Sequence, residues 1–154
     1  MKTFFAGLTI ASLAVAGVAT AQDAPFAREI KARQGIMVYR AMQLGVLGGM
    51  AKGEVEYNAE AAQKAADNLV TAVSIDASML WPKGSDNSAN PASTALAAMW
   101  EDGSGIGDKA KALNDAAAAM QAAAGTGLDG LKTAMGPVGE ACGACHKAFR
   151  VPTN

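Results

Sequence analysis

The sequence predicts an all-α protein, folded as an antiparallel four-helix bundle. The chain is rich in alanine, and aromatic residues make up only 5% of it. Its apolar residues recur at intervals of three and four, the period of a helix with one buried face. No convincing strand pattern is present. Four such segments, joined by short or moderate connections, favour neighbouring helices that run antiparallel.

Three of the expected helices span residues 25–52, 58–78 and 105–124. Asn58 suits the cap of the second helix, and Glu60 suits the positive end of its dipole. Gly125 is a suitable end for the third helix. The stripes expected to face the core are Ile30, Arg33, Met37, Ala41, Leu44, Gly48 and Ala51 in the first helix, Leu69, Val70 and Val73 in the second, and Ile106, Ala110, Leu113, Ala117, Met120 and Ala124 in the third.

The last helix, residues 128–149, has the clearest pattern. Thr126 and Asp129 match a helix-start signature, and Pro137 is expected to kink the helix without ending its pattern. Because His146 comes four residues after Cys142, it projects to nearly the same side of the helix. The apolar face is the series Leu128, Leu131, Met135, Val138, Cys142, Cys145 and Phe149, which places both cysteines toward the core.

The series Cys142-Gly143-Ala144-Cys145-His146 contains both cysteines and the only histidine of the chain. In a C-x-x-C-H run the two thiols attach a haem through thioether bonds, and the imidazole becomes an axial ligand of the iron. The motif therefore predicts one haem c, bound by Cys142, Cys145 and His146 and enclosed by the bundle.

Other interpretations of the motif are weaker. A zinc site normally has four ligands, and here the supply of cysteine and histidine ends at three. A thioredoxin-like C-x-x-C needs a βαβ context, whereas the flanking sequence is helical. A structural disulfide across two residues would remove little loop entropy.

The N-terminus predicts export. Residues 1–21 comprise Lys2, an apolar stretch over residues 4–18 and the small residues Ala19-Thr20-Ala21, which together indicate a cleaved signal peptide. The apolar stretch is too short to span a membrane, so we expect no membrane insertion after cleavage. Residues 22–154 then form one domain. Because haem is attached covalently on the exported side of bacterial membranes, motif and signal both predict a periplasmic protein.

Charge and motif content exclude other function classes. The chain has 13 basic and 14 acidic residues and lacks the basic stripe of a nucleic-acid-binding protein. It has no phosphate-binding loop, and its single histidine is already assigned to iron. We therefore expect neither an enzyme nor a nucleic-acid partner.

Residues 79–91 form the irregular connection between the second and third helices. Trp81-Pro82, Lys83-Gly84 and a cluster of Asp, Asn and Ser favour turns. Trp81 is expected either to cover a haem edge or to fill the end of the bundle. A short helix is expected from Pro91 toward Trp100.

Several of these segments resemble a known family. They are the C-terminal C-x-x-C-H followed by Phe149-Arg150, the approach Leu131-Lys132-x-x-Met135-x-Pro137-x-Gly139-x-Ala141-Cys142, the Met50-Ala51-Lys52-Gly53 link and the Met99-Trp100 segment. Over residues 22–150 the chain resembles class II cytochromes c, the cytochrome c′ family. The resemblance implies a haem bound through the last helix, with a residue of the first helix on the opposite face of the iron.

That opposite residue divides the family. High-spin members have leucine, phenylalanine or a similar group there, whereas the low-spin branch has methionine. The resemblance places it four positions after a basic residue, so Arg33 implies Met37. Helical geometry agrees, because Met42 is rotated about 140° from Met37 at about 100° per residue. Methionine is also a common core filler, and that alternative stays open.

If Met37 binds iron, the resemblance implies the low-spin branch and a one-electron carrier. Thioether sulfur favours ferrous iron, and a six-coordinate iron moves little between oxidation states. The partners would be redox proteins that the sequence does not identify. If Met37 only packs near the iron, the protein is instead a five-coordinate cytochrome c′ that binds nitric oxide or carbon monoxide. Since high-spin members are often dimers through the first two helices, the chain is expected to be a monomer or a homodimer.

Two arginines are further candidates for the haem site. The resemblance implies that Arg33, one turn before Met37, pairs with a haem propionate, but an exposed position on the helix is equally compatible with the sequence. Arg150 follows His146 by four residues and is expected to shield the proximal face or to stabilise the end of the last helix.

Overall fold

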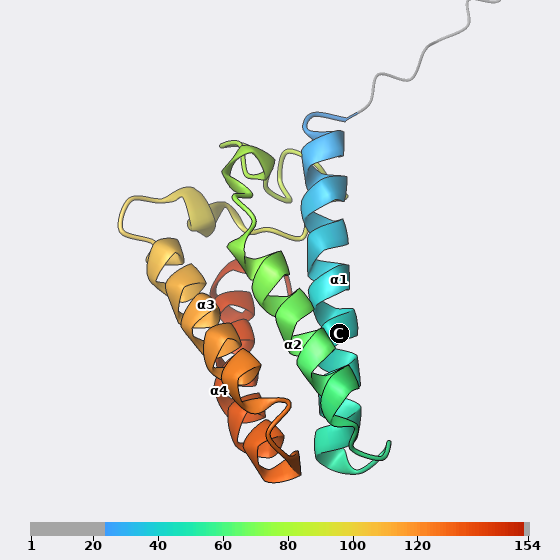
Figure 1. Cartoon of the computed structure of the whole chain (residues 1–154). Coiled ribbons are helices and arrows are strands. Elements are labelled where there is room, and N and C mark those ends of the chain that lie inside the picture. The colour runs from blue at the N-terminus through green and yellow to red at the C-terminus, as the bar shows by residue number, and fades with distance from the viewer. Residues whose placement is uncertain (1–23, 153–154) are drawn as a thin grey trace, which may run out of the picture.

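The computed structural model describes residues 24–152, so the expected signal peptide lies outside the described residues. Its four main helices are α1 (Ala27–Lys52), α2 (Ala59–Ser74), α3 (Ile106–Ala123) and α4 (Leu128–Phe149). They pack as a ring in which α1 contacts α2 and α4, and α3 contacts α2 and α4 (Figure 1). Neighbours in this ring run in opposite directions, which confirms the antiparallel four-helix bundle.

The apolar core is packed most densely at the end of the bundle where α1 ends and α4 begins. Leu47, Leu69, Met120, Leu131 and Val138 bring one fully buried side chain or more from each of the four helices. Full burial of a side chain of this size contributes about 1.5–3 kcal/mol. Alanines fill the spaces between these larger residues and let the helices approach closely.

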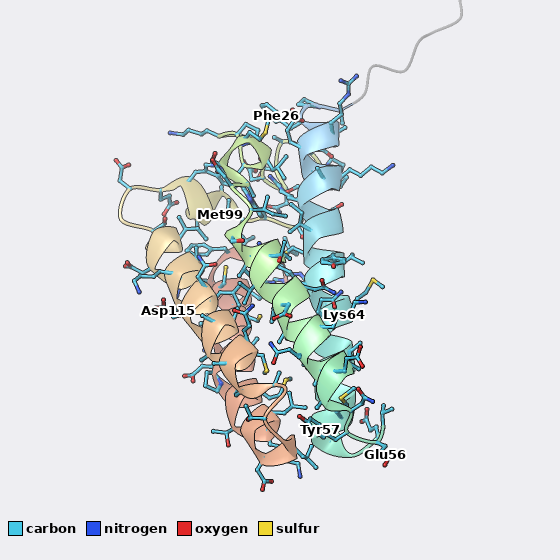
Figure 2. All side chains as sticks on the ribbon, viewed as in Figure 1. Phe26, Glu56, Tyr57, Lys64, Met99 and Asp115 are labelled. Carbon is cyan, nitrogen blue, oxygen red and sulfur yellow. The ribbon has the colours of Figure 1, made fainter. Side chains whose placement is uncertain are left out.

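A hydrogen bond closes this packed end. The hydroxyl of Tyr57 donates to the carbonyl oxygen of Ala124 over 2.8 Å, joining the link after α1 to the link after α3. Figure 2 shows Tyr57 at this end of the bundle, with Phe26 and Met99 at the opposite end.

The connection between α2 and α3 covers the opposite end (Figure 1). It contains two short 3-10 helices, η1 (Ser78–Leu80) and η2 (Ala97–Trp100). The backbone N–H of Leu96 donates to the carbonyl of Phe149 over 2.9 Å, and that of Val151 donates to Thr94 over 2.8 Å. Within residues 24–152 the single β-bridge, between Ala95 and Arg150, belongs to this contact. The connection is thereby fastened to the chain directly after α4.

Arg33 of α1 anchors the same connection from inside. Its side chain is only 4% exposed. The guanidinium donates to the hydroxyl and carbonyl oxygens of Ser85, both at 2.6 Å, to the hydroxyl of Ser93 at 2.7 Å and to the carbonyl of Leu80 at 3.2 Å. It also lies 4.3 Å from the ring centroid of Trp81. Burial lowers the pKa of Arg33, and these oxygens replace the water that the cation loses.

Trp81 fills the end of the bundle together with Trp100. The two ring centroids are 6.4 Å apart, and the indole N–H of Trp100 donates to the carbonyl of Trp81 over 2.9 Å. With Arg33 against its ring, Trp81 matches the second of the two positions that the sequence allows for it.

The ends of two elements differ from the sequence prediction. Helix α2 ends at Ser74 rather than at residue 78, because the carboxylate of Asp76 accepts the N–H of Ser78 and starts η1. The short helix expected from Pro91 is wrong. The side-chain oxygen of Asn90 accepts the N–H of Ala92 in a turn, and regular structure resumes only at η2.

Two helix caps were also expected. Asn58 caps α2 as predicted, since its side chain accepts the N–H of Ala61 over 2.9 Å. The predicted cap of α4 is wrong, because Gly127 precedes the helix and provides no side-chain bond. Thr126 donates its hydroxyl to the carbonyl of Ala123 instead and so closes the end of α3.

Replacing Arg33 should weaken the anchored end of the bundle. We expect Arg33→Met to lower the free energy of unfolding of the haem-loaded protein by about 2–4 kcal/mol, because several charge-assisted hydrogen bonds are lost together. Gln34→Ala is the matched control, since Gln34 makes one exposed hydrogen bond to Ala92 in the same connection. It should cost about 1 kcal/mol or less. Urea unfolding measures both, and equal losses would contradict an anchoring role for Arg33.

Candidate haem-binding site

The two cysteines and the histidine lie together near the end of α4, which continues through Pro137 as predicted. Cys142 and Cys145 are half-buried, and His146 is exposed. Burial raises the pKa of both thiols. Partial burial, aided by the charge of Arg150, lowers the pKa of His146 and so favours the neutral imidazole that coordinates metals.

The core is incomplete at the level of these three residues. In α4 no residue between Ala141 and Phe149 is buried, and in α1 none is buried between Arg33 and Leu47. The stripe of α3 is buried only in its second half. The core-facing residues that remain partly or fully exposed at this level are Met37 and Leu44 in α1, Val73 in α2, Ile106, Ala110 and Leu113 in α3, and Cys142 and Cys145 in α4.

This pattern fits a large apolar group held between the helices. Apolar positions that face inward normally lose nearly all of their exposure, and binding sites for cofactors are lined mainly by such side chains. Two thiols and an imidazole on the same wall add the chemistry that fixes a haem covalently and ligates its iron. The residues present therefore fit the haem that the motif predicts.

Arg40 joins α1 to α2 beside the incomplete part of the core. Its Nε and Nη2 donate to the carbonyl of Ala72 in α2 over 3.2 and 2.7 Å, and its Nη1 lies 3.8 Å from the sulfur of Met37. Burial lowers the pKa of Arg40, while Cys142 and Cys145 act to raise it. Arg40 thus lies close enough to interact electrostatically with both thiols while it contacts Met37.

Arg40 is the site residue that the sequence analysis missed. The stripe of α1 was expected to pass through Ala41, but Ala41 is exposed and the position belongs to Arg40. The available signal was spacing, because Arg33, Met37 and Arg40 alternate steps of four and three. A charged residue at such a position is usually taken to be solvated.

The two methionines near this level differ in position. Met37 is 37% exposed and contacts Arg40, whereas Met42 is 62% exposed and lies off the stripe, as expected. Met37 therefore lies on the same side of α1 as Arg40, the residue that interacts electrostatically with Cys142 and Cys145 of α4. Its bond to iron stays a prediction.

The two candidate arginines lie in different surroundings. The alternative of an exposed Arg33 is wrong, since that side chain is buried against the connection, and its pairing with a propionate stays a prediction. Its Nε takes no part in the hydrogen bonds found within the described residues. Arg150 is exposed just beyond α4, and its backbone N–H donates to the carbonyl of His146 over 3.0 Å.

Across residues 24–152 no group of three or more His, Cys, Asp or Glu side chains is placed to hold a metal ion. A groove of about 480 Å³ between α3 and α4 is lined by residues such as Ala123, Thr133 and Pro137, and Cys142 does not line it. The described helices include none long and apolar enough to cross a membrane.

A four-helix bundle with a C-x-x-C-H motif near the end of its last helix defines a bundle-type c-type cytochrome. The family model described as Cytochrome C′ matches residues 28–150, and the chain belongs to this family. The resemblance stated from the sequence is therefore confirmed. Like the family, the protein carries a covalently bound haem c.

Relatives named cytochrome c-554 and relatives named cytochrome c′ are both similar to this chain. Cytochrome c-554 of Cereibacter sphaeroides is 47% identical over 88% of this chain and 90% of its own length. The solved cytochrome c′ from Rhodobacter Spheriodes is 38% identical, with a TM-score of 0.81, over 83% of this chain and 98% of that one. The nitric oxide complex of a leucine-to-valine mutant of cytochrome c′ from Alcaligenes xylosoxidans is 27% identical, with a TM-score of 0.70, over 80% of this chain and 94% of that one.

The attachment can be tested by removing the thiols. Replacing both Cys142 and Cys145 with alanine should let acidic organic solvent extract all of the haem, whereas the native protein should retain it, because thioether bonds survive this treatment. Cys142→Ala alone is the control and should keep its haem through the second thiol. Haem that extracts freely from the native protein would contradict covalent attachment.

The incomplete core predicts that stability depends on haem. We expect the apoprotein to unfold with a free energy at least about 3 kcal/mol lower than the holoprotein, since more than one large apolar side chain loses its cover. Amide hydrogen exchange should show the loss at residues 37–44 and 106–113, with protection retained at residues 131–138. Equal unfolding midpoints for the two forms would show that the core is complete without the cofactor.

Proposed function

We propose that the protein is a periplasmic one-electron carrier whose iron is bound by His146 on one side and Met37 on the other. Cys142 and Cys145 would form the two thioether bonds. The haem supplies a one-electron iron couple when bound. The observation that carries the proposal is the incomplete part of the core, which Met37 of α1 shares with Cys142 and Cys145 of α4.

The chain's own residues hold the two ligands in fixed positions. The carbonyl of His146 accepts the N–H of Arg150. The carbonyl of Phe149, three residues after His146, accepts the N–H of Leu96. Met37 lies one turn after the buried anchor Arg33, so its place on α1 is tied to the covering connection. Ligands that move little between oxidation states suit electron transfer, and no catalytic base or open coordination position is needed.

The location rests on the sequence of the N-terminus. Residues 1–21 have the features of a cleaved signal peptide, and attachment of haem to a C-x-x-C-H motif takes place outside the cytoplasm of bacteria. The partners would be other redox proteins of the same compartment.

A second copy of the chain is a further candidate partner. Val38, Met42 and Val46 form an exposed apolar stripe on α1, and nothing lies within 4 Å of the position that a side chain on Gly45 would occupy. A helix face of this kind allows close approach of the same face on another protomer, as in a two-fold dimer.

Gas binding is the alternative function. It is supported by the solved cytochrome c′ from Alcaligenes xylosoxidans, whose leucine-to-valine mutant forms a complex with nitric oxide. In that case Met37 packs beside the iron, His146 is the single protein ligand, and access of the gas depends on the side chains of α1. The spin state of the iron separates this alternative from the carrier.

Met37→Leu separates the two functions. If the sulfur binds iron, this variant should convert a low-spin ferrous haem that resists carbon monoxide into a high-spin haem that binds the gas readily, because leucine fills a similar volume without a donor atom. Visible absorption spectra in both oxidation states measure the change. Met42→Leu is the control and should leave spin state and carbon monoxide binding unaltered.

The opposite result is equally clear. A native protein that is already high-spin, or whose spectrum is the same after the Met37 substitution, would remove the carrier mechanism and favour the gas-binding protein.

A further inference from the structure

We propose that Arg40 makes the Met37 side of the haem selective for small inorganic anions over neutral gases whenever the sulfur is not bound to iron. The proposal rests on His146 as the axial ligand from α4 and on Met37 lying opposite to it. It assigns a binding role to a residue that the carrier function does not use.

The guanidinium of Arg40 is held in place by the backbone of α2. Two of its nitrogen atoms, Nε and Nη2, donate to the same carbonyl oxygen of Ala72. Ala72 lies in the last turn of α2, where carbonyl groups have no partner within the helix. This contact satisfies that carbonyl, complements the negative end of the helix and fixes the plane of the guanidinium. Nη1 is left pointing toward the sulfur of Met37.

The sulfur is a poor partner for this donor. A thioether accepts hydrogen bonds only weakly, and the N–S distance is 3.8 Å. An anion at the same place would receive a charge-assisted hydrogen bond, which is about twice as strong as a neutral one. Carbon monoxide and nitric oxide carry no net charge and would gain much less.

The positive charge of Arg40 has no carboxylate partner among the described side chains. Ion pairs among the described residues join Lys52 to Glu54 and Lys111 to Asp115, so no carboxylate of this part of the chain pairs with Arg40. The side chain is half-buried, which strengthens its electrostatic interactions relative to those of a solvated cation.

Other cations near the region are less suited to this role. Arg33 directs its hydrogen bonds to the oxygens of Ser85, Ser93 and Leu80 in the connection. Lys109 of α3 acts electrostatically on Cys145 and has no comparable contact with Met37. Arg40 alone among these cations contacts the residue that faces the open side of the iron.

Azide binding to the ferric holoprotein tests the proposal, with Met37→Ala as the background because it opens the position whether or not the sulfur binds iron. Adding Arg40→Gln, which keeps amide donors for Ala72 but removes the charge, should weaken azide binding about tenfold. Adding Arg40→Lys should keep the affinity within about threefold, since the charge remains. Carbon monoxide binding to the ferrous forms should change by less than about threefold throughout.

The control is Arg28→Leu in the same background, because Arg28 is an exposed cation at the start of α1. It should leave both affinities unaltered. Titrations followed in the Soret band give all dissociation constants, and thermal unfolding checks that each variant is folded. If Arg40→Gln does not fold, the charge-retaining Arg40→Lys is compared with Arg40→Met.

Two results would overturn the proposal. One is an unchanged azide affinity after loss of the Arg40 charge, and the other is an equal weakening of azide and carbon monoxide, which would indicate a structural effect. The native spectrum keeps this test separate from the carrier proposal. A high-spin native protein contradicts ligation by Met37 but leaves the comparison of Arg40 variants valid, whereas a low-spin native protein with no azide effect contradicts only the role of Arg40.

Discussion

The placement of the haem attachment site on the inner side of α4 is the constraint on which the rest of the bundle depends. A macrocycle bound to Cys142 and Cys145 would lie between the helices, which fits the incomplete side-chain core at that level of the described residues. The large buried residues gather instead at the other end, around Leu47, Leu131 and Val138. Alanine-rich helices suit this division, because they pack closely at one end and leave space for a wide group at the other.

The end of the bundle beyond the attachment site is closed by polar contacts together with buried apolar side chains such as Ile30 and Met99. Arg33 organises this end through oxygens of the α2–α3 connection, and the connection pairs in turn with the chain after α4. The hydrogen bonds from Leu96 and Arg150 lie within one turn of His146. The same contacts that cover the end of the bundle therefore restrict the position of His146.

The sequence was sufficient for the parts of the structure that depend on local patterns. The 3.6-residue period predicted all four main helices, and the C-x-x-C-H motif named the cofactor. It failed where contacts distant in sequence decide the outcome. Neither the burial of Arg33 against Ser85 nor the contact of Arg40 with Ala72 follows from helical spacing. The early end of α2 depends on the single bond from the N–H of Ser78 to Asp76, and Thr126 bonds back to Ala123 instead of capping α4.

Arg33 and Arg40 lie one turn before and one turn after Met37, and neither has a carboxylate partner among residues 24–152. Arg33 directs its hydrogen bonds to the connection, and its positive charge is buried there. The positive charge of Arg40 is half-buried near Cys142 and Cys145. A buried positive charge near a redox centre disfavours the more positive ferric state, and burial protects this effect from screening by salt. The two cations and a thioether ligand would then act in the same direction, toward ferrous iron. In that case the residues that hold α1 against α2 and the connection would also influence the redox properties of the site.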